Sequence, residues 1–317
     1  MNPVEVSVLL VSYNSVGLLP RLAASIDACT DVNMQVLVLD NASVDGSAEW
    51  FARCRPDWQL VVNRTNVGFG RANNQLLPLV RGRHLLLLNT DAFMAPDALR
   101  AALDYLTAHP DVGIVGAQLR GDDGLVQPSA RFFPAPWRLF LQRSGLDRWL
   151  PMQARIDLPF WQIAEITDCD WVPGCFYLIR REALDHVGLF DPRFFLYYEE
   201  IDHARRTKRA GYKVRCLPHV DVIHVGGASS QSVGEVTASG RQLQALLNES
   251  EVLYLRKHFG IAGLCLHLLL QSTLSSAQWL VWRLRSRPGR APAAAWAVLT
   301  GLWRSVLTTR GGQLPTR

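Results

Sequence analysis

The sequence predicts an α/β protein with a mostly parallel central sheet flanked by helices. Short runs rich in apolar and β-branched residues alternate with stretches of helical length over the first third of the chain. Because these runs are continuously apolar, they indicate strands that are buried on both faces, as in parallel sheets. The predicted strands are Val6–Val11, Gln35–Leu39, Gln59–Val62, His84–Leu88 and Val112–Val115.

The stretches between these strands supply the helical crossovers that parallel strands need. Clusters of Asn, Asp, Ser and Gly follow the first, second and fourth strands. Ligands of open α/β sheets bind at the carboxyl ends of the strands, so we expect the chemistry of the protein in these clusters. The predicted helices lie near Val16–Ile26, Ala48–Arg53, Gly70–Val80 and Asp97–His109.

Composition limits the class of protein and its partners. The 317 residues are 49% hydrophobic and 19% charged, a globular composition that leans apolar. The formal charge is +5 at pH 7, but the basic excess gathers in Arg283–Arg317, which contains arginines and no acidic residue. This charge belongs to a tail and not to a groove with interleaved aromatic residues, so no nucleic-acid partner is expected.

Cysteine usage and the first residues indicate an intracellular protein. The six cysteines are scattered, without a C-x-x-C pair or the spacing of a disulfide framework, so we expect reduced thiols. The first five residues contain no basic region, and the apolar run that follows is too short for a signal peptide. That run is better interpreted as the first buried strand.

Two segments depart from the alternation of strands and helices. Arg120–Ile166 contains several prolines and tryptophans and a Gly-Asp-Asp-Gly turn, which predicts a loop-rich insertion specific to a partner. Thr167–Gly227 is expected to be a second ordered block, with short strands and one helix among polar and aromatic residues.

The C-terminal segment 259–317 is predicted to be helical and to lie on a membrane. Phe259–Trp282 has 24 residues without Lys, Arg, Asp or Glu, which is long enough to cross a bilayer. Polar residues interrupt it and its leucines recur at helical spacing, which favours a helix in the membrane interface over a span. A second apolar stretch, Ala291–Trp303, follows; a helical hairpin that closes the fold is the alternative. The arginines between the two stretches are Arg283, Arg285, Arg287 and Arg290.

The loops after the first two predicted strands carry groups that suit a nucleotide base. The first strand ends in Val11–Asn14 and the second runs into Asp40–Ser47. Each loop by itself fits an ordinary turn or helix cap. At neighbouring strand ends, however, they offer the ring of Tyr13 for stacking and the carboxylate of Asp40 as acceptor for a pyrimidine imide.

Two later loops suit phosphate and metal. Asn66–Gly70 opens a helix that carries Arg71, and glycines at a helix N-terminus let backbone N–H groups approach an anion. The fourth strand ends in Asn89–Asp91, where a rigid carboxylate can hold Mg²⁺ or Mn²⁺ on a diphosphate. A turn aspartate is the alternative for Asp91. Neither the dinucleotide-binding fingerprint nor the Walker lysine motif is present.

The ordered motifs Val-Ser-Tyr-Asn, Asp-Asn-Ala-Ser-x-Asp-Gly-Ser, Asn-x-Gly-Phe-Gly and Asn-Thr-Asp resemble the family 2 glycosyltransferases, most of all their rhamnosyltransferase-like branch. The resemblance covers about Val4–Gly227. It implies a GT-A (Rossmann-like) fold, a nucleotide-diphospho-sugar donor, Mg²⁺ or Mn²⁺ and inversion at the anomeric carbon. The residues expected to bind the nucleotide are Val11, Tyr13, Asn14, Asp40, Asn66, Gly70, Arg71, Asn89, Thr90 and Asp91.

The resemblance also implies metal ligands. Asp91 falls on the last residue of the family's D-x-D motif, and Asn89 replaces the first acid, although an amide oxygen can still bind a metal. His224 ends a short apolar strand at the position where relatives supply a further ligand, and imidazole suits Mn²⁺. A purely structural histidine is the alternative.

A general base and an acceptor segment are implied in the second half of the chain. Inversion needs one base to take the proton of the attacking hydroxyl, and the family's Glu-Asp-x-Asp motif falls on residues 199–202. Glu200 is therefore the expected base, with Glu199 as the alternative. Trp171, Pro173 and Gly174 resemble the acceptor-facing segment, and core packing is the alternative role of the indole.

These assignments predict the organisation of an enzyme. Residues 1–258 are expected to form the transferase domain, with a nucleotide-binding half (1–119) and an acceptor and catalytic half (120–258), and 259–317 the helical segment. The expected donor is dTDP-rhamnose, with UDP-sugars as the alternative. The expected acceptor is a saccharide or lipid-linked saccharide in cell-surface polysaccharide synthesis, at the cytoplasmic face of the inner or plasma membrane.

Two other classes of protein remain open. A sugar-phosphate nucleotidyltransferase uses a similar nucleotide-binding sheet, but it needs a glycine-rich, basic loop after the first strand, and Val11–Gly17 is not one. A non-catalytic protein that binds nucleotide or carbohydrate is suggested by Asn89 and Glu200, which replace residues of the family's motifs.

Overall fold

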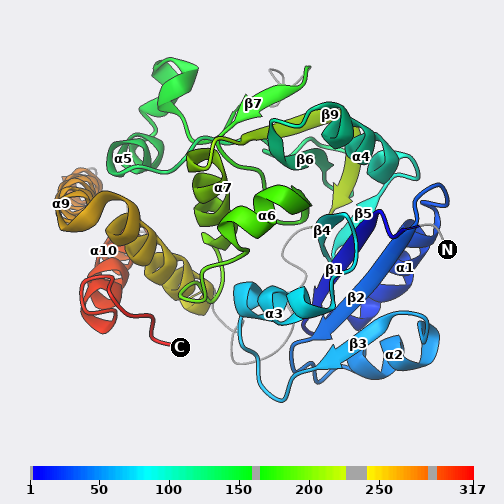
Figure 1. The fold of residues 1–317 in the computed structure, drawn as a ribbon. Helices are drawn as coiled ribbons and strands as arrows, with labels where there is room; N and C mark the ends of the chain where they lie inside the picture. Colours follow the sequence, from blue (N-terminus) through cyan, green and yellow to red (C-terminus); the bar gives the residue numbers. More distant parts are fainter. Residues whose placement is uncertain (1–2, 159–164, 226–240, 285–290) are drawn as a thin grey trace. The chain divides into compact units, whose positions relative to one another are not determined.

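The computed structural model describes residues 3–158, 165–225, 241–284 and 291–317. One sheet with the strand order β3-β2-β1-β4-β8-β6-β9-β5 forms its centre, and β7 pairs with β9 (Figure 1). The strands are β1 (Val6–Ser12), β2 (Met34–Asp40), β3 (Gln59–Val62), β4 (His84–Asn89), β5 (Ala92–Met94), β6 (Val112–Arg120), β7 (Thr167–Cys169), β8 (Phe176–Arg180) and β9 (Lys213–His224).

Helices follow most of these strands, as the alternating pattern predicts. The α-helices are α1 (Leu19–Asp27), α2 (Ser47–Cys54), α3 (Phe69–Leu76), α4 (Ala98–Ala108), α5 (Pro136–Ser144), α6 (Arg181–Val187), α7 (Glu199–Arg209), α9 (Arg241–Leu284) and α10 (Ala291–Thr308). The short 3₁₀ helices are η1 (Val16–Leu18), η2 (Leu77–Leu79), η3 (Asp147–Trp149) and η4 (Met152–Ala154).

The chain divides into two compact units. The first contains the whole sheet and consists of Met1–Phe132, Asp157–Pro192 and Glu199–Thr237. The second contains α5, α9 and α10 and consists of Phe133–Ile156, Arg193–Tyr198 and Ala238–Arg317. A boundary after residue 258 stays a prediction, and of the expected basic cluster Arg285, Arg287 and Arg290 lie outside the described residues.

The structure confirms the five predicted strands: four form the parallel half of the sheet, and β6 covers the fifth. β1 pairs in parallel with β2 and β4, and β2 with β3. The residues of β1, β2 and β4 are almost all buried, which explains their continuous apolar runs. Alternate side chains face opposite sides of the sheet, so Val8 and Leu10 join a core with Leu22 of α1 and Leu99 of α4.

The other half of the sheet is mixed, so a mostly parallel sheet describes only part of the structure. β8 runs antiparallel to β4 and β6, and β5 and β7 run antiparallel to β9. Only two residues separate β4 from β5, too few for a parallel crossover. The expectation of one helix in Thr167–Gly227 is also wrong, because the block contains α6 and α7. α6 has only seven residues and ends before Gly188, whose φ of 68° stops the helix.

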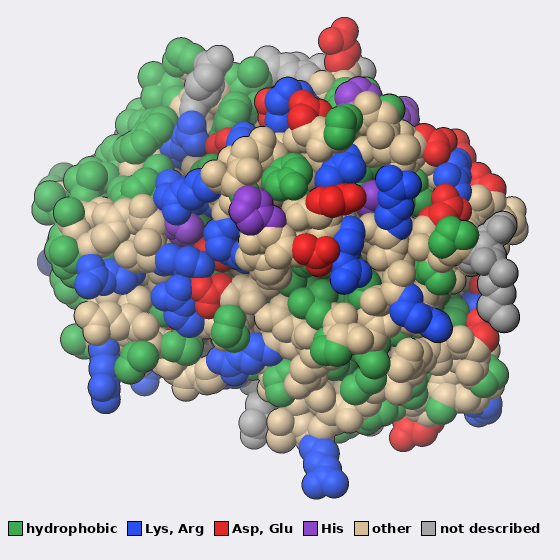
Figure 2. Space-filling view, in the orientation of Figure 1, with side chains coloured by type: hydrophobic (Ala, Val, Ile, Leu, Met, Phe, Trp, Pro, Cys, Tyr) green, Lys and Arg blue, Asp and Glu red, His purple; other side chains and the backbone are tan. Residues whose placement is uncertain are grey.

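In the second unit, α9 contains a break, and the helix after the break exposes mostly apolar side chains. Gly260 has φ 68° and ψ −167°, which divides α9 into two helices. In the second of these, the buried side includes the polar side chains of His267, Gln271 and Ser275. Its exposed side is apolar, and Figure 2 shows hydrophobic side chains gathered over α9 and α5. The exposed residues are Ile261, Leu266, Leu269, Trp279, Leu280, Val281 and Leu284.

Among the described residues, one helical segment, Gln242–Val281, is long and apolar enough to cross a membrane by length and composition alone. The break at Gly260 falls inside it.

A buried acid joins α5 to α9 within the second unit. Arg143 of α5 donates from Nη2 to both carboxylate oxygens of Glu251, at 2.9 and 2.7 Å. Tyr198 Oη also donates to Glu251 at 2.9 Å, and His267 Nε2 lies 2.9 Å from its Oε1. Burial by itself raises the pKa of Glu251, but the Arg143 charge and these partners outweigh it and lower that pKa to about 2.

Replacing Arg143 with Ala is expected to destabilise the fold by about 3 kcal/mol at neutral pH, because it removes the main countercharge of a buried carboxylate. The folded pKa of Glu251 lies below the ordinary value of 4.5, so its contribution is present above that pH and lost as pH falls toward 2. Denaturant unfolding followed by the helical circular dichroism signal measures the effect. Arg148→Ala, at an exposed position of the same unit, should change it by less than about 0.5 kcal/mol, and an equal loss in both variants would contradict the assignment.

Candidate active site

The register of the parallel strands brings the predicted polar clusters to one edge of the sheet. Ser12 of β1 pairs with Asp40 of β2, and Val11 pairs with Asn89 at the end of β4. The loops that follow these three strands therefore start side by side, at the carboxyl ends where ligands of such sheets bind.

The loops after β1 and β2 hold each other in place. The backbone N–H of Asn14 donates to Ser43 Oγ at 2.9 Å, and Asn14 Oδ1 accepts from the backbone N–H of Val44 at 2.8 Å. Asn14 has a φ of 49°, a left-handed conformation that asparagine tolerates better than most residues. Tyr13 is half-buried between the two anchored segments. Asn14 thus has a structural role beside its predicted place in the nucleotide site.

Asp40 presents a carboxylate oxygen without a partner. The residue is fully buried, and its Oδ1 accepts from the backbone N–H of Ser43 at 2.9 Å. Its Oδ2 is also buried and accepts no hydrogen bond from any residue that the structure describes. A buried acceptor without a donor costs about 1–3 kcal/mol, a cost that a ligand N–H would remove.

The loop before α3 is shaped by amide side chains. Asn66 Oδ1 accepts from the backbone N–H of Gly68 at 2.9 Å and from Asn41 Nδ2 at 2.8 Å. Gly68 has a φ of 88°, which favours glycine, and Gly70 is buried in the first turn of the helix. Arg71, expected near phosphate, donates from Nε to the backbone oxygen of Pro192 at 2.8 Å.

Asp91 and His224 lie together, as a shared metal site requires. β5 pairs with β9 so that Ala92 faces His224, and the Asp91 backbone oxygen accepts from the N–H of Val225 at 3.1 Å. The His224 Nε2 atom is 3.7 Å from Oδ1 of the buried Asp91. Thr90, which precedes Asp91, is also buried. Asn89 Oδ1 is buried without a hydrogen-bond partner among the described residues.

Gln127 orients His224 and was not identified from the sequence. Gln127 Nε2 donates to the backbone oxygen of His224 at 2.9 Å, which fixes the amide so that its Oε1 lies 2.9 Å from His224 Nδ1. Nδ1 must therefore carry the proton, and Nε2 turns its lone pair toward Asp91. Metal-bound histidines are typically held in this way by a second residue. No local pattern marks Gln127, because 97 residues separate it from its partner.

The side chains of Asp91, His224 and Asn89 suit a hard divalent cation whose other coordination positions are filled by oxygens of a bound ligand. Within the ranges that the structure describes, no group of three or more His, Cys, Asp or Glu side chains could hold a metal. The pair Asp91 and His224, with the unpartnered oxygen of Asn89, leaves most of a coordination sphere to other oxygens. Mg²⁺ at nucleotide sites is commonly bound in this way, by one or two protein groups and phosphate oxygens.

The two glutamates at the start of α7 lie near the end of β4. The Asn89 backbone N–H donates to the Cys175 oxygen at 3.1 Å, which joins the end of β4 to the segment before β8. A Cβ atom on the adjacent Gly174 would lie 3.9 Å from Cβ of Glu200. Tyr177 Oη donates to the Glu200 backbone oxygen at 3.3 Å and lies 3.0 Å from His203 Nδ1. The start of α7 is thereby fixed to β8.

Burial raises the pKa of both glutamates. Both have a buried Oε2 atom without a described hydrogen-bond partner. Burial raises the pKa of Glu200 to about 7, while backbone N–H groups and the charge of Arg131 oppose that rise. Burial and the neighbouring Glu200 charge raise the pKa of Glu199 well above its ordinary value. The pKa of each carboxyl is thus raised, in both cases chiefly by burial.

The expected acceptor segment divides into a packed and a more open part. Trp171 is buried, its Nε1 donates to the Phe132 oxygen at 3.0 Å, and the Arg131 guanidinium lies 4.9 Å from the ring centroid. These contacts match the core-packing alternative for the indole. Pro173 and Gly174 are half-buried beside Glu200, and their role toward an acceptor stays a prediction.

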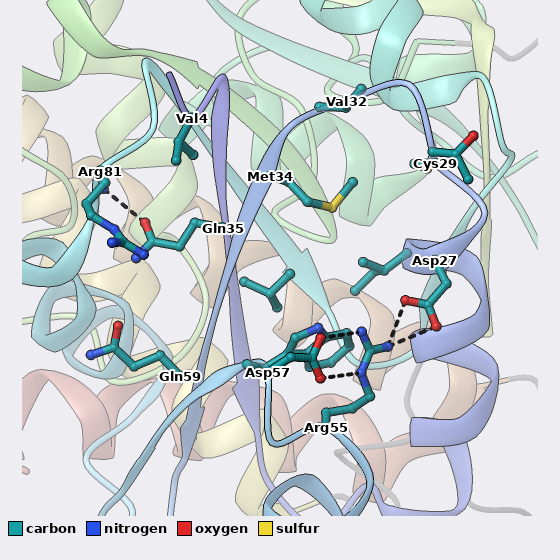
Figure 3. A pocket seen from close by; sticks show the side chains of 14 residues that line it. Val4, Asp27, Cys29, Val32, Met34, Gln35, Arg55, Asp57, Gln59 and Arg81 are labelled. Carbon is teal, nitrogen blue, oxygen red and sulfur yellow. Dashed lines mark hydrogen bonds and ion pairs between the residues drawn. The ribbon is translucent and has the colours of Figure 1, made fainter. Parts of the chain in front are cut away.

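A pocket of about 360 Å³ lies at the opposite edge of the parallel strands, near the start of β2 (Figure 3). Of its charged groups, Arg55 pairs with Asp27 and Asp57, each at 2.9 Å. Gln35 Oε1 accepts from the backbone N–H of Arg81 at 3.0 Å. The candidate site remains the carboxyl edge, where Asp40, Asn89 and the two glutamates have buried oxygens without described partners.

The fold is that of the GT-A glycosyltransferases. It matches the mannosyltransferase PcManGT from Pyrobaculum calidifontis, solved with GDP-Man and Mn²⁺, with a TM-score of 0.55 and 16% identity over 98% of this chain and 88% of that one. It also matches GalNAc-T7, solved with UDP, GalNAc and Mn²⁺, with a TM-score of 0.53 and 15% identity over 79% of this chain and 48% of that one. The predicted GT-A fold is confirmed.

The chain belongs to glycosyl transferase family 2, whose model matches residues 7–188. The N-acetylglucosaminyl-diphospho-decaprenol L-rhamnosyltransferase of Mycobacterium tuberculosis H37Rv is 29% identical over 241 residues, 68% of this chain and 75% of the relative. Rhamnosyltransferase WbbL of Escherichia coli K12 is 26% identical over 174 residues, 52% of this chain and 63% of the relative. The predicted family and branch are confirmed, and the nucleotidyltransferase alternative is wrong.

Replacing Gln127 with Leu is expected to release His224 from the tautomer with the proton on Nδ1. The variant loses the acceptor that fixes the proton, so its imidazole populates both tautomers. Nitrogen NMR of the histidine rings measures this shift without any ligand. The exposed His219 serves as an internal reference, and an unchanged His224 tautomer would show that Gln127 does not set it.

Proposed function

We propose that the protein transfers L-rhamnose from dTDP-rhamnose, with inversion, to a saccharide or lipid-linked saccharide in cell-surface polysaccharide synthesis. The observation that carries this proposal is the strand register, which aligns Asp40 with Ser12 and Asn89 with Val11 at one edge. The two rhamnosyltransferase relatives favour this donor and support a lipid-linked acceptor, which the name of the mycobacterial relative specifies. A UDP-sugar donor is the alternative.

The nucleotide is assigned to the loops after β1, β2 and β3. The unpartnered Oδ2 of Asp40 accepts the imide N–H that thymine and uracil share, and the half-buried ring of Tyr13 supplies a stacking face. Backbone N–H groups at the start of α3, shaped by Asn66 and Gly68, face the phosphates. Arg71 adds positive charge close by, with Nε held by Pro192.

The metal is assigned to Asp91 and His224, with the amide oxygen of Asn89 as a further ligand. When bound there, Mg²⁺ or Mn²⁺ would neutralise the charge that grows on the departing nucleoside diphosphate. Gln127 keeps the His224 Nε2 lone pair available for it. Both solved structural neighbours contain Mn²⁺, which supports this assignment.

Glu200 is assigned as the general base of a single displacement. Its carboxylate takes the proton of the acceptor hydroxyl as that oxygen bonds to the anomeric carbon and the bond to the diphosphate breaks. A pKa of about 7 gives it both an ionised fraction and enough basicity at neutral pH. Burial and the neighbouring Glu200 charge raise the pKa of Glu199 well above its ordinary value, and Glu199 is the alternative base.

The second unit supports attachment to a membrane. Most outward side chains of α9 after Gly260 are apolar, unlike those of a helix that faces water. Its buried side carries the polar His267, Gln271 and Ser275 besides leucines. Lipid is the surrounding that suits this arrangement, and tryptophans and arginines near the helix ends suit an anionic interface. We therefore propose peripheral attachment at the cytoplasmic face of the inner or plasma membrane.

Calorimetric titration with dTDP and UDP, each with and without Mn²⁺, tests the donor site. We expect Mn²⁺-dependent binding of dTDP that weakens by about 10- to 100-fold in Asp91→Ala. Asp40→Asn should weaken both nucleotides with and without metal, because it turns an amide N–H toward the imide N–H of the base. Asp97→Ala, a matched exposed acid outside the site, should bind like the wild type. Tighter binding of UDP would favour the alternative donor, and no binding of either would refute the assignment.

The pH dependence of sugar transfer tests the base. The rate constant kcat/KM should rise with pH to a plateau above about 7, because Glu200 acts in its ionised form. Glu200→Gln should lower kcat by about 10²- to 10⁴-fold and abolish this rise of kcat/KM with pH (the basic limb), while the affinity for dTDP stays unchanged. Glu199→Gln is the matched control and should keep the limb. If the two variants exchange these results, Glu199 is the base.

A further inference from the structure

A second apolar patch lies in the Phe133–Ile156 segment of the second unit. Between the start of α5 and the end of η3, and just after it, four large apolar side chains are exposed: Trp137, Leu146, Trp149 (by 78%) and Leu150. This Trp137–Leu150 patch falls in the insertion that the sequence marks as specific to a partner. Figure 2 shows hydrophobic side chains over α5.

The fold itself does not require these side chains. The interior of α5 is supplied by Pro136 and Leu139, which are buried, whereas both tryptophans point outward. Large apolar side chains that stay in water give up roughly 25 cal/mol for each Å² left exposed, and tryptophan has the largest such area. A cluster of four is therefore expected to have a partner in the working protein.

The charges around the patch indicate the chemistry of that partner. The Arg138 guanidinium lies 5.0 Å from the Trp137 ring centroid, and that of Arg148 lies 5.8 Å from the Trp149 ring centroid. Residues 136–155 contain four arginines and one acid, Asp147. Arg143 pairs with the buried Glu251, so the other three arginines give this segment its positive charge. Tryptophan at the level of the headgroups with arginine beside it is typical of contact with an anionic bilayer. A second copy of the chain would bring the same positive charges together.

The helix α5, which carries Trp137, is joined to α9. Arg143 of α5 and the buried Glu251 of α9 form a two-bond ion pair, and both helices belong to one compact unit. α5 therefore keeps a fixed position relative to α9, and both can meet one surface without a change in the fold.

We propose that the Trp137–Leu150 patch inserts into the headgroup region of an anionic bilayer and forms, with α9, a membrane-binding surface of two parts. This inference rests on the proposed membrane attachment of α9. It gives the insertion a role that the C-terminal helices do not supply: two separated contacts fix the tilt of the unit on the membrane, whereas one helix permits rotation about its own axis.

Binding of the full-length protein to vesicles tests this inference. The vesicles consist of phosphatidylcholine, alone or mixed with phosphatidylglycerol. Trp149→Glu is expected to weaken binding to the mixed vesicles by at least about tenfold, and Trp149→Phe, which stays apolar and aromatic, to keep it within about threefold. Leu125→Glu, at a 69% exposed position of the first unit, makes the matched change of charge and should have no effect.

Leu269→Glu, at a 62% exposed position of α9, separates the two proposals. Loss of binding in both Trp149→Glu and Leu269→Glu supports the surface of two parts. Loss in Leu269→Glu alone overturns the role of the patch and leaves the attachment by α9. Loss in neither overturns both. If Trp149→Glu instead dissociates a dimer in light scattering and binds vesicles normally, a second copy covers the patch and the inference is wrong. Unchanged dTDP binding and unfolding midpoints show that the variants fold.

Discussion

The register of β1 between β2 and β4 is the constraint on which the rest of the site depends. Each of these strands is apolar on both faces, so a slip of one residue would exchange the two faces and turn Asp40 and Asn89 away from their positions. The site is then extended by one backbone hydrogen bond, from Asn89 to Cys175, which places Gly174 and Glu200 next to the end of β4. Packing of the core therefore determines the spacing of the candidate site residues.

The same edge collects polar atoms that the fold leaves unsatisfied. Oδ2 of Asp40, Oδ1 of Asn89 and the Oε2 atoms of both glutamates are buried without hydrogen-bond partners among the described residues. Each such atom costs stability, whereas the buried carboxylate of Glu251 is paired. Their presence together at one edge is understandable if a ligand supplies the missing donors and cation. Side chains that the fold already holds in place need no rearrangement when that ligand binds.

The sequence predicted what local pattern encodes and missed what depends on distant contacts. The strands β1 to β4 and the loops after them follow from apolar runs and turn residues, and Asp40, Asn89 and Asp91 were located in this way. Gln127 was missed because only the folded chain brings it to His224. The antiparallel strands of the second half also depend on long-range pairing. Glu199 and Glu200 are neighbours with the same chemistry, and only their different surroundings in the fold give them different acidities.

The second half of α9 shows why average hydropathy could not decide between a soluble and a membrane helix. Its composition includes the polar residues His267, Gln271 and Ser275, which lower its mean hydropathy. The structure places these three side chains on the buried side, where Leu264 and Leu268 accompany them, and leaves the outer side to Ile261, Leu266, Leu269 and Leu280. Polar residues that face the protein add nothing to the cost of contact with lipid, whereas the outer leucines gain from it. The direction of each side chain, and not the average over the helix, therefore carries the argument for the membrane.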